Sequence, residues 1–173
     1  DYNAGPCLPI ALPHRTFAAV HRRDDDTVRL VSGLAPTELW AGRIADLGPG
    51  EGGAAQAGWA AYAAGVAWAL RENGYAVSGF DAAIDSCVPL GAGLSSSAAL
   101  ECAIGLALSD LHALGLGGDD AGRTALAAAC VRAENDVVGA PTGGMDQAAS
   151  LRATHGHALL LDNRDQSVRQ VPL

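Results

Sequence analysis

The sequence predicts one domain of the α+β class, a mixed α/β fold of two layers, that takes in residues 1–173. Strand-like runs come first and then alternate with helical stretches, which is the order expected of a mixed domain. Hydrophobic residues make up 49% of the chain, enough for one sizeable core, whereas aromatic residues make up only 5%. We therefore expect a core of small side chains between closely packed helices.

The individual elements are predicted from the spacing of apolar residues and from the turn residues between them. An acidic run at 24–26 separates two strand-like runs and predicts a solvated hairpin tip. Within the first helical stretch, Trp59, Tyr62, Val66 and Leu70 recur at helical spacing and predict a face packed in the core. The predicted elements are strands at 7–12, 15–21 and 27–33, a helix at about 55–72, a strand at 75–86, helices at about 96–114 and 119–135, and a final strand at 157–162.

Charge and cysteine content exclude several classes of partner. The formal net charge is −8 and all 11 cationic residues are arginine, so the basic stripe that nucleic-acid binding requires is absent. No run approaches the ~20 apolar residues that span a bilayer. Cys7, Cys87, Cys102 and Cys130 lack CxxC spacing, which predicts buried thiols in a reducing cytoplasm. We expect a cytoplasmic protein with no nucleic-acid or membrane partner, and the oligomeric state stays open.

The stretch VPLGAGLSSSAALECA at 88–103 predicts an anion-binding loop. Gly91 and Gly93 permit backbone conformations that point successive amides into one concavity, and the serines at 95–97 are expected to cap the following helix. The alternative is a serine N-cap that simply follows a glycine turn. A Walker-type phosphate loop is excluded because its GK[ST] ending is missing and the chain contains no lysine.

Glu134 is a candidate metal ligand. Counting back by fours from it reaches Cys130 and Leu126, which places this carboxylate on the apolar side of its predicted helix. Beside a phosphate site, a buried acid is a natural ligand for Mg²⁺, which takes one or two protein oxygens together with the phosphates. The alternative is a partly exposed glutamate paired with Arg132 or Arg123.

Asp146 is a candidate for proton transfer. It follows Gly143 and Gly144, which leave room for a ligand to approach the backbone. An aspartate in such a place can accept a hydroxyl proton or orient a hydroxyl for attack on a γ-phosphate. The alternative is an N-cap for a short helix that begins at Gln147.

Taken together, these segments resemble a known family. PLGAGLSSSAAL at 89–100 resembles the nucleotide-binding motif of the GHMP kinase superfamily. Within that superfamily, four further segments resemble the galactokinase family and occur in the family's order over nearly the whole chain. They are DYNAGPCLPIAL at 1–12, WAAYAAGV at 59–66, RAENDVVG at 132–139 and GGMDQAAS at 143–150.

The resemblance implies a reaction and a set of site residues. It implies transfer of a phosphoryl group from ATP to the anomeric hydroxyl of α-D-galactose, giving galactose 1-phosphate and ADP. Asp146 matches the catalytic base, Ser97 and Glu134 match the Mg²⁺ ligands, and Asp1 and Gly143 match contacts to the sugar. The residues implied to wrap the ATP phosphates are Gly91, Ala92, Gly93, Leu94, Ser95, Ser96 and Ser97.

Departures from the family pattern set further expectations. In the family, an arginine that faces the catalytic aspartate precedes the position of Asp1, and this arginine is not among the 173 residues. The family's first strand and C-terminal half are not among them either. We therefore expect a domain incomplete at both ends, and little or no turnover from the 173 residues alone. Gly144 replaces a commoner isoleucine and Val137 a commoner phenylalanine, which bears on sugar preference.

Three alternative functions stay open at this point. The chain could belong to a kinase for another sugar, such as N-acetylgalactosamine or arabinose. It could belong to a galactose-sensing regulator without turnover, although the intact GLSSSAAL favours an enzyme. It could also be a nucleotide-binding module that has no acceptor site.

Overall fold

A four-stranded sheet forms one layer of the molecule. The structure is a computed structural model, and it describes residue 3 and residues 5–50 and 54–173. The strand order is β2-β5-β3-β4, with β3 and β5 parallel and the other pairs antiparallel. Because β5 lies between β2 and β3, those two strands do not pair, and the predicted hairpin at 24–26 is wrong. The strands are β2 (Thr16–Arg22), β3 (Thr27–Ser32), β4 (Ala35–Arg43) and β5 (Phe80–Ser86).

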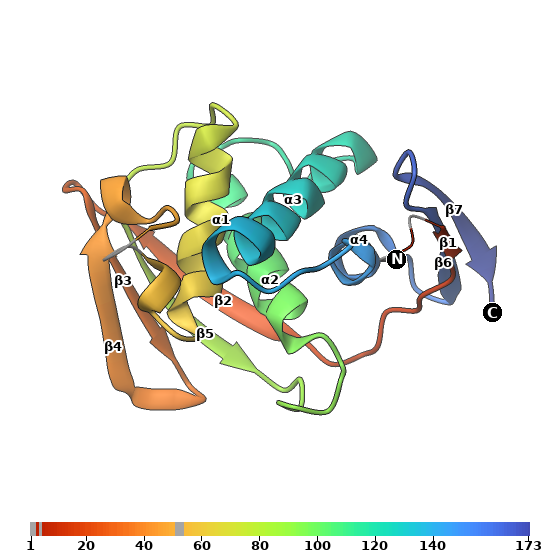
Figure 1. Cartoon of the computed structure of the whole chain (residues 1–173), viewed down its shortest axis with the longest axis horizontal. Coiled ribbons are helices and arrows are strands. Elements are labelled where there is room, and N and C mark those ends of the chain that lie inside the picture. Colours follow the sequence, from red (N-terminus) through yellow and green to blue (C-terminus); the bar gives the residue numbers. More distant parts are fainter. Residues whose placement is uncertain (1–2, 4, 51–53) are drawn as a thin grey trace.

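Helices cover one face of this sheet and form the second layer (Figure 1). Val28, Leu30 and Phe80 of the sheet are fully buried in the same core as Leu70 and Ile104 of the helices. The helices are α1 (Ala60–Glu72), α2 (Ser96–Leu111), α3 (Asp120–Arg132) and α4 (Met145–Arg152). Short 3₁₀ turns, η1 (Ile44–Asp46) and η2 (Ala54–Gln56), and a π-helical segment, η3 (Ala133–Val138), complete this layer.

The helices approach one another closely, as the alanine-rich composition predicts. A Cβ atom placed on Gly65 of α1 would lie 3.0 Å from the Ala133 Cβ and 3.3 Å from the Val137 Cβ. A larger side chain at position 65 would therefore push α1 away from η3. Within the part of the chain that the structure describes, no helix is both long and apolar enough to cross a membrane.

A second, three-stranded sheet lies beyond α4, at the far end of the molecule from β4 (Figure 1). It packs Leu159 and Leu161 against Ala148 of α4 in a small core of its own. The predicted strand at 7–12 shrinks to Pro6–Cys7, and residues 8–15 belong to no strand. The strands, in the order β1-β6-β7, are β1 (Pro6–Cys7), β6 (His157–Asp162) and β7 (Ser167–Pro172).

The α+β class is confirmed, while the prediction of the elements is incomplete. The predicted helices and the strands at 15–21, 27–33 and 157–162 appear within a few residues of their expected bounds, and the strand at 75–86 begins only at Phe80. β4, β7 and α4 were not among the predicted elements. The buried thiols are confirmed for Cys102 and Cys130, whereas Cys87 is exposed, and all four cysteines are free.

Candidate functional site

The loop before α2 has the backbone conformation that its glycines predict. Gly91 and Gly93 adopt φ values of +71° and +70°, in the region that favours glycine. Ser95 is also left-handed, with φ 56° and ψ 48°, and its side chain makes no capping hydrogen bond, so the expected serine cap is wrong. Since α2 begins at Ser96, the first N–H groups of the helix receive no acceptor from the Ser95 side chain and stay available to an anion.

Glu134 lies where α3 widens into the π-helical segment η3. The Gly139 N–H donates to the Glu134 carbonyl, five residues back, which is the hydrogen bond of a π-helix. The Glu134 side chain is buried, as helical counting predicts, with 9% of the residue exposed. Within the described part of the chain it forms no ion pair.

The two arginines that offered an alternative explanation for Glu134 have other partners. Arg132 pairs with Asp136 and Glu72, and its guanidinium stacks over the Trp68 ring at 4.6 Å. Arg123 donates to backbone carbonyls. The alternative of a partly exposed glutamate paired with Arg132 or Arg123 is therefore wrong.

Ser97, Glu134 and Asp146 meet at one place, although they come from α2, η3 and α4. The Ser97 hydroxyl lies close enough to the Glu134 carboxylate to favour its charged form, and the charge of Asp146 acts on the same carboxylate. Burial, which is the largest cause, and the nearby Asp146 charge raise the pKa of Glu134, and the Ser97 hydroxyl and the hydrogen bond from Gln147 oppose that rise. A cation at this place would relieve the burial penalty of Glu134.

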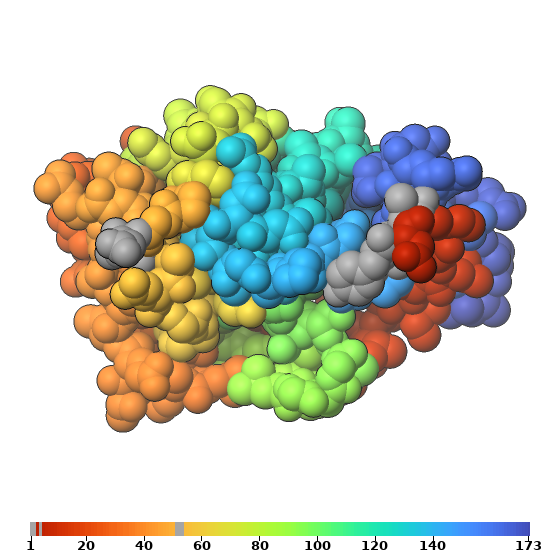
Figure 2. Space-filling view, viewed as in Figure 1, coloured from red at the N-terminus to blue at the C-terminus, as the bar shows by residue number. Residues whose placement is uncertain are grey.

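Asp146 lies in the first turn of α4. That helix begins at Met145 and its N-cap residue is Gly144, with φ 95°, so the alternative of an Asp146 N-cap for a helix beginning at Gln147 is wrong. The preceding loop is held to η3 by the Asn135 side chain, which accepts from the Thr142 N–H at 2.8 Å and donates to the Thr142 carbonyl at 3.3 Å. In Figure 2 this segment, in sky blue, faces the green loop before α2 across a recess.

A small cavity adjoins the first turn of α2. Its volume is about 150 Å³ and its walls are mainly apolar, with hydroxyl groups from both layers. Trp59 and Tyr62 line it, so these aromatic residues border a cavity, whereas Val66 and Leu70 are fully buried in the core as predicted. The full lining is Thr16, Ser32, Leu34, Trp59, Tyr62, Ile84, Ser86, Leu90, Ser96, Ser97 and Leu100.

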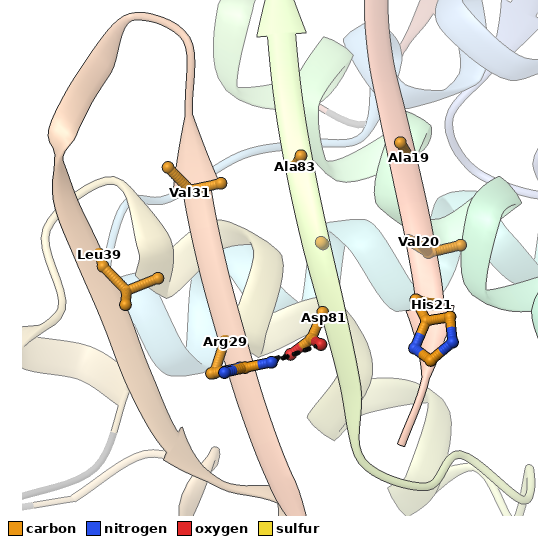
Figure 3. A pocket seen from close by; sticks show the side chains of 9 residues that line it. Ala19, Val20, His21, Arg29, Val31, Leu39, Asp81 and Ala83 are labelled. Atoms are coloured by element: carbon orange, nitrogen blue, oxygen red, sulfur yellow. Dashed lines mark hydrogen bonds and ion pairs between the residues drawn. The ribbon is translucent and has the colours of Figure 1, made fainter.

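A larger hollow, of about 380 Å³, lies on the sheet face that the helices leave uncovered (Figure 3). Leu39, Val31 and Ala83 line it, and the Arg29 guanidinium pairs with the Asp81 carboxylate at 2.7 Å across its floor. None of the predicted site residues borders this hollow. We therefore place the candidate site at the smaller cavity, where Ser97 lies beside Glu134.

Two polar residues at the site were not singled out from the sequence. Gln147 and Glu101 are fully buried, and the Gln147 side chain joins Glu101 to Glu134. Glu101 precedes the buried Ile104 by three residues and Leu108 by seven, so helical counting could have placed it on the apolar face of α2. Gln147 lies on an eight-residue helix that is too short to show a periodic pattern.

Two predicted sugar contacts have no observed role here. Asp1 lies outside the described residues. Gly143 is half-buried in the loop before α4, three positions from Asp146. Among residues 3, 5–50 and 54–173, no group of three or more His, Cys, Asp or Glu side chains is placed to hold a metal ion.

Comparison with known proteins gives the family. Residues 61–154 match the model of the GHMP kinases N terminal domain, which is more than half of the chain. A galactokinase of Streptomyces coelicolor is 53% identical over 175 residues, which cover 99% of this chain and 42% of that protein. The chain thus spans less than half the length of this relative.

Solved structures share the fold. A crystal structure of Lactococcus lactis galactokinase complexed with galactose superposes with a TM-score of 0.86 at 29% identity, over 99% of this chain and 42% of that one. The Methanococcus jannaschii mevalonate kinase superposes with a TM-score of 0.71 at 14% identity, over 99% of this chain and 50% of that one. The second likeness extends only to the fold.

Proposed function

The chain belongs to the GHMP kinase family, and from that premise we propose that it supplies the ATP- and galactose-binding part of a galactokinase. The proposed reaction transfers the γ-phosphoryl group of ATP to the anomeric hydroxyl of α-D-galactose and releases ADP. One observation carries the proposal: Ser97, Glu134 and Asp146 converge beside a glycine loop that opens onto a helix N-terminus. The galactokinase relatives support galactose as the acceptor.

The loop from Gly91 to Ser97 is proposed to bind the ATP phosphates. Phosphoryl transfer relies on positioning and on charge stabilisation, and this chain has no lysine to contribute. The positive φ values of Gly91 and Gly93 and the free N-terminus of α2 support binding by backbone N–H groups and by the helix dipole. The adjoining cavity beside Trp59 and Tyr62 is proposed to take the adenosine part of ATP.

Ser97 and Glu134 are proposed to hold Mg²⁺ together with the phosphates. The donor set fits, because Mg²⁺ commonly binds one or two protein oxygens and takes its other ligands from phosphates and water. The burial of Glu134 without an ion-pair partner in the described chain supports a cation there. When bound, Mg²⁺ neutralises charge on the phosphate oxygens.

Asp146 is proposed to take the proton from the anomeric hydroxyl of the sugar. Its carboxylate lies in the first turn of α4 and close enough to Glu134 for its charge to act there, so acceptor and donor would meet at one point. Gly143 and Asp1 are proposed as sugar contacts on the family resemblance. Residues outside the matched 42% of the relative would complete the site. The buried free thiols of Cys102 and Cys130 support a reducing cytoplasm as its location.

A panel of sugars tests the proposal. The 173 residues would be joined to the flanking segments of the Streptomyces coelicolor galactokinase and assayed for sugar-dependent ADP release. We expect galactose to be the best substrate by kcat/KM among galactose, N-acetylgalactosamine and arabinose. Faster turnover of either other sugar would contradict the proposed acceptor. ATP binding without turnover of any sugar would favour a regulator or a nucleotide-binding module instead.

A further inference from the structure

A buried amide joins two carboxyl groups behind the proposed metal site. The Gln147 Nε2 group donates to Glu134 Oε2 at 2.8 Å and to Glu101 Oε2 at 3.0 Å. These bonds use both protons of the amide group. Because the residues belong to α4, η3 and α2, the bridge joins three elements at the point where the site assembles.

Glu101 is unusual because it is a carboxyl group with no exposed surface. It follows Ser97 by one helical turn on the same face of α2. Burial is the main reason why its pKa is raised, to about 9, so it holds a proton at neutral pH. Within the described residues it has no ion-pair partner, and both Glu101 Oε1 and Gln147 Oε1 lack a hydrogen-bond partner. An apolar residue would pack here at a lower cost, so stability does not explain Glu101.

We propose that Gln147 and Glu101 are positioning residues for Glu134, and that they form a hydrogen-bonded brace which holds Glu134 Oε2 and leaves Oε1 to bind the metal. This inference rests on the proposed function, in which Glu134 is a Mg²⁺ ligand. Gln147 supplies the donor to Glu134. Glu101 acts through Gln147, because accepting the second amide proton keeps the NH₂ group, and not the amide oxygen, turned toward Glu134.

The brace also bears on metal preference. Mg²⁺ requires near-octahedral geometry at short distances, whereas Ca²⁺ readily accepts both oxygens of one carboxylate. A Glu134 carboxylate with one oxygen occupied by Gln147 is restricted to a single metal bond. The brace therefore favours Mg²⁺ over Ca²⁺.

The test measures Mn²⁺ binding to the 173-residue chain in the presence of ADP, from the electron paramagnetic resonance signal of free Mn²⁺, with Mg²⁺ and Ca²⁺ as competitors. Loss of a residue that orients a metal ligand typically lowers metal affinity about 10–100-fold. We expect Gln147→Leu and Glu101→Leu each to weaken Mn²⁺ binding by at least about 10-fold and to reduce the preference for Mg²⁺ over Ca²⁺. Glu101→Gln keeps an acceptor oxygen and should stay within about threefold of the unchanged chain.

A second measurement reports on the brace without any ligand. In the unliganded chain, the side-chain amide protons of Gln147 should exchange slowly with solvent by NMR, and Glu101→Leu should speed their exchange. Ser109→Ala is the matched control, because Ser109, also on α2, accepts a buried hydrogen bond from the Leu116 N–H and, among the described residues, makes no hydrogen bond with Glu134. We expect it to lower the melting temperature while leaving Mn²⁺ affinity and Gln147 exchange unchanged.

The outcomes separate this inference from the proposed function. If the unchanged chain does not bind Mn²⁺ with ADP, or Glu134→Ala binds as tightly, the metal site itself is refuted and the brace with it. If Glu134→Ala loses affinity while Gln147→Leu and Glu101→Leu do not, the brace alone is refuted. Equal losses in Glu101→Gln and Glu101→Leu would refute the role assigned to the acceptor oxygen.

Discussion

The carboxyl group of Glu101 links folding to pH. Burial and the neighbouring Glu134 charge raise its pKa to about 9 from 4.5, and the hydrogen bond from Gln147 only partly opposes them. Between about pH 4.5 and 9, the folded chain therefore keeps a proton that the unfolded chain has already released. Its contribution to stability is present below this range and is lost as the pH rises through it.

Replacing Glu101 by glutamine should remove this pH dependence. We expect the free energy of unfolding of the unchanged chain to fall relative to that of Glu101→Gln between about pH 5 and 9, because only the unchanged chain has the Glu101 carboxyl group that titrates there. The slope has a limit of about 1.4 kcal/mol per pH unit for one proton. Urea unfolding at a series of pH values measures it. Parallel curves for the two chains would mean that Glu101 is already ionised in the folded state.

The sequence predicted that Glu134 is a buried residue of the site, but it did not predict its hydrogen-bond partner Gln147. Counting by fours placed Glu134 beside Cys130 because a helix repeats its face over that interval. Helical counting relates residues within one helix only. The amide bridge joins α2, η3 and α4, so it could not be predicted in this way. The Ser97 and Asp146 positions came from motifs, and the structure adds that both act on the Glu134 carboxylate.

Among the elements, the start of α2 holds a residue in an unfavourable backbone conformation. Ser95 is left-handed, with φ 56°, which typically raises the energy of a non-glycine residue by about 1–2 kcal/mol. Ser96 is the first residue of the helix. Glycine adopts the left-handed conformation of position 95 without strain, whereas it is unfavourable at position 96, inside the helix.

The two neighbouring serines should therefore respond oppositely to the same substitution. We expect Ser95→Gly to raise the free energy of unfolding by about 0.5–1 kcal/mol, after the extra chain entropy of glycine is counted. Ser96→Gly should lower it by about 1 kcal/mol. Urea unfolding of the two variants compares them directly. Similar losses in both would show that Ser95 is not strained.

Two of the three elements that the sequence did not predict, β4 and β7, are edge strands. β4 exposes most of its residues, Leu39 among them, so its sequence lacks the alternation by which half-buried strands are found. β7 is also an edge strand. Its Gln170 side chain donates to the carbonyl of Arg152 at the end of α4, and the Arg152 guanidinium donates to the Gln166 carbonyl just before β7. Such contacts join distant segments and leave no local pattern.

For the whole molecule, the 173 residues contain the loop and the carboxylates that are proposed to bind ATP and the metal, but they cover only 42% of the Streptomyces coelicolor relative. Assayed alone, they are expected to release little ADP in response to galactose, because the arginine expected to face Asp146 is not among them. The completed chain with the relative's flanking segments is the comparison. Comparable galactose-dependent turnover by the 173 residues alone would show that those segments are dispensable.

Asp146 is proposed to accept the proton of the sugar hydroxyl, at a site where Ser97 and Glu134 would hold the metal. The most direct measurement is kcat for galactose in the completed chain with and without Asp146→Asn, together with ADP affinity. Removing a general base should lower kcat by about 10²–10⁴-fold, while ADP affinity should change little. An unchanged kcat in Asp146→Asn would contradict the account.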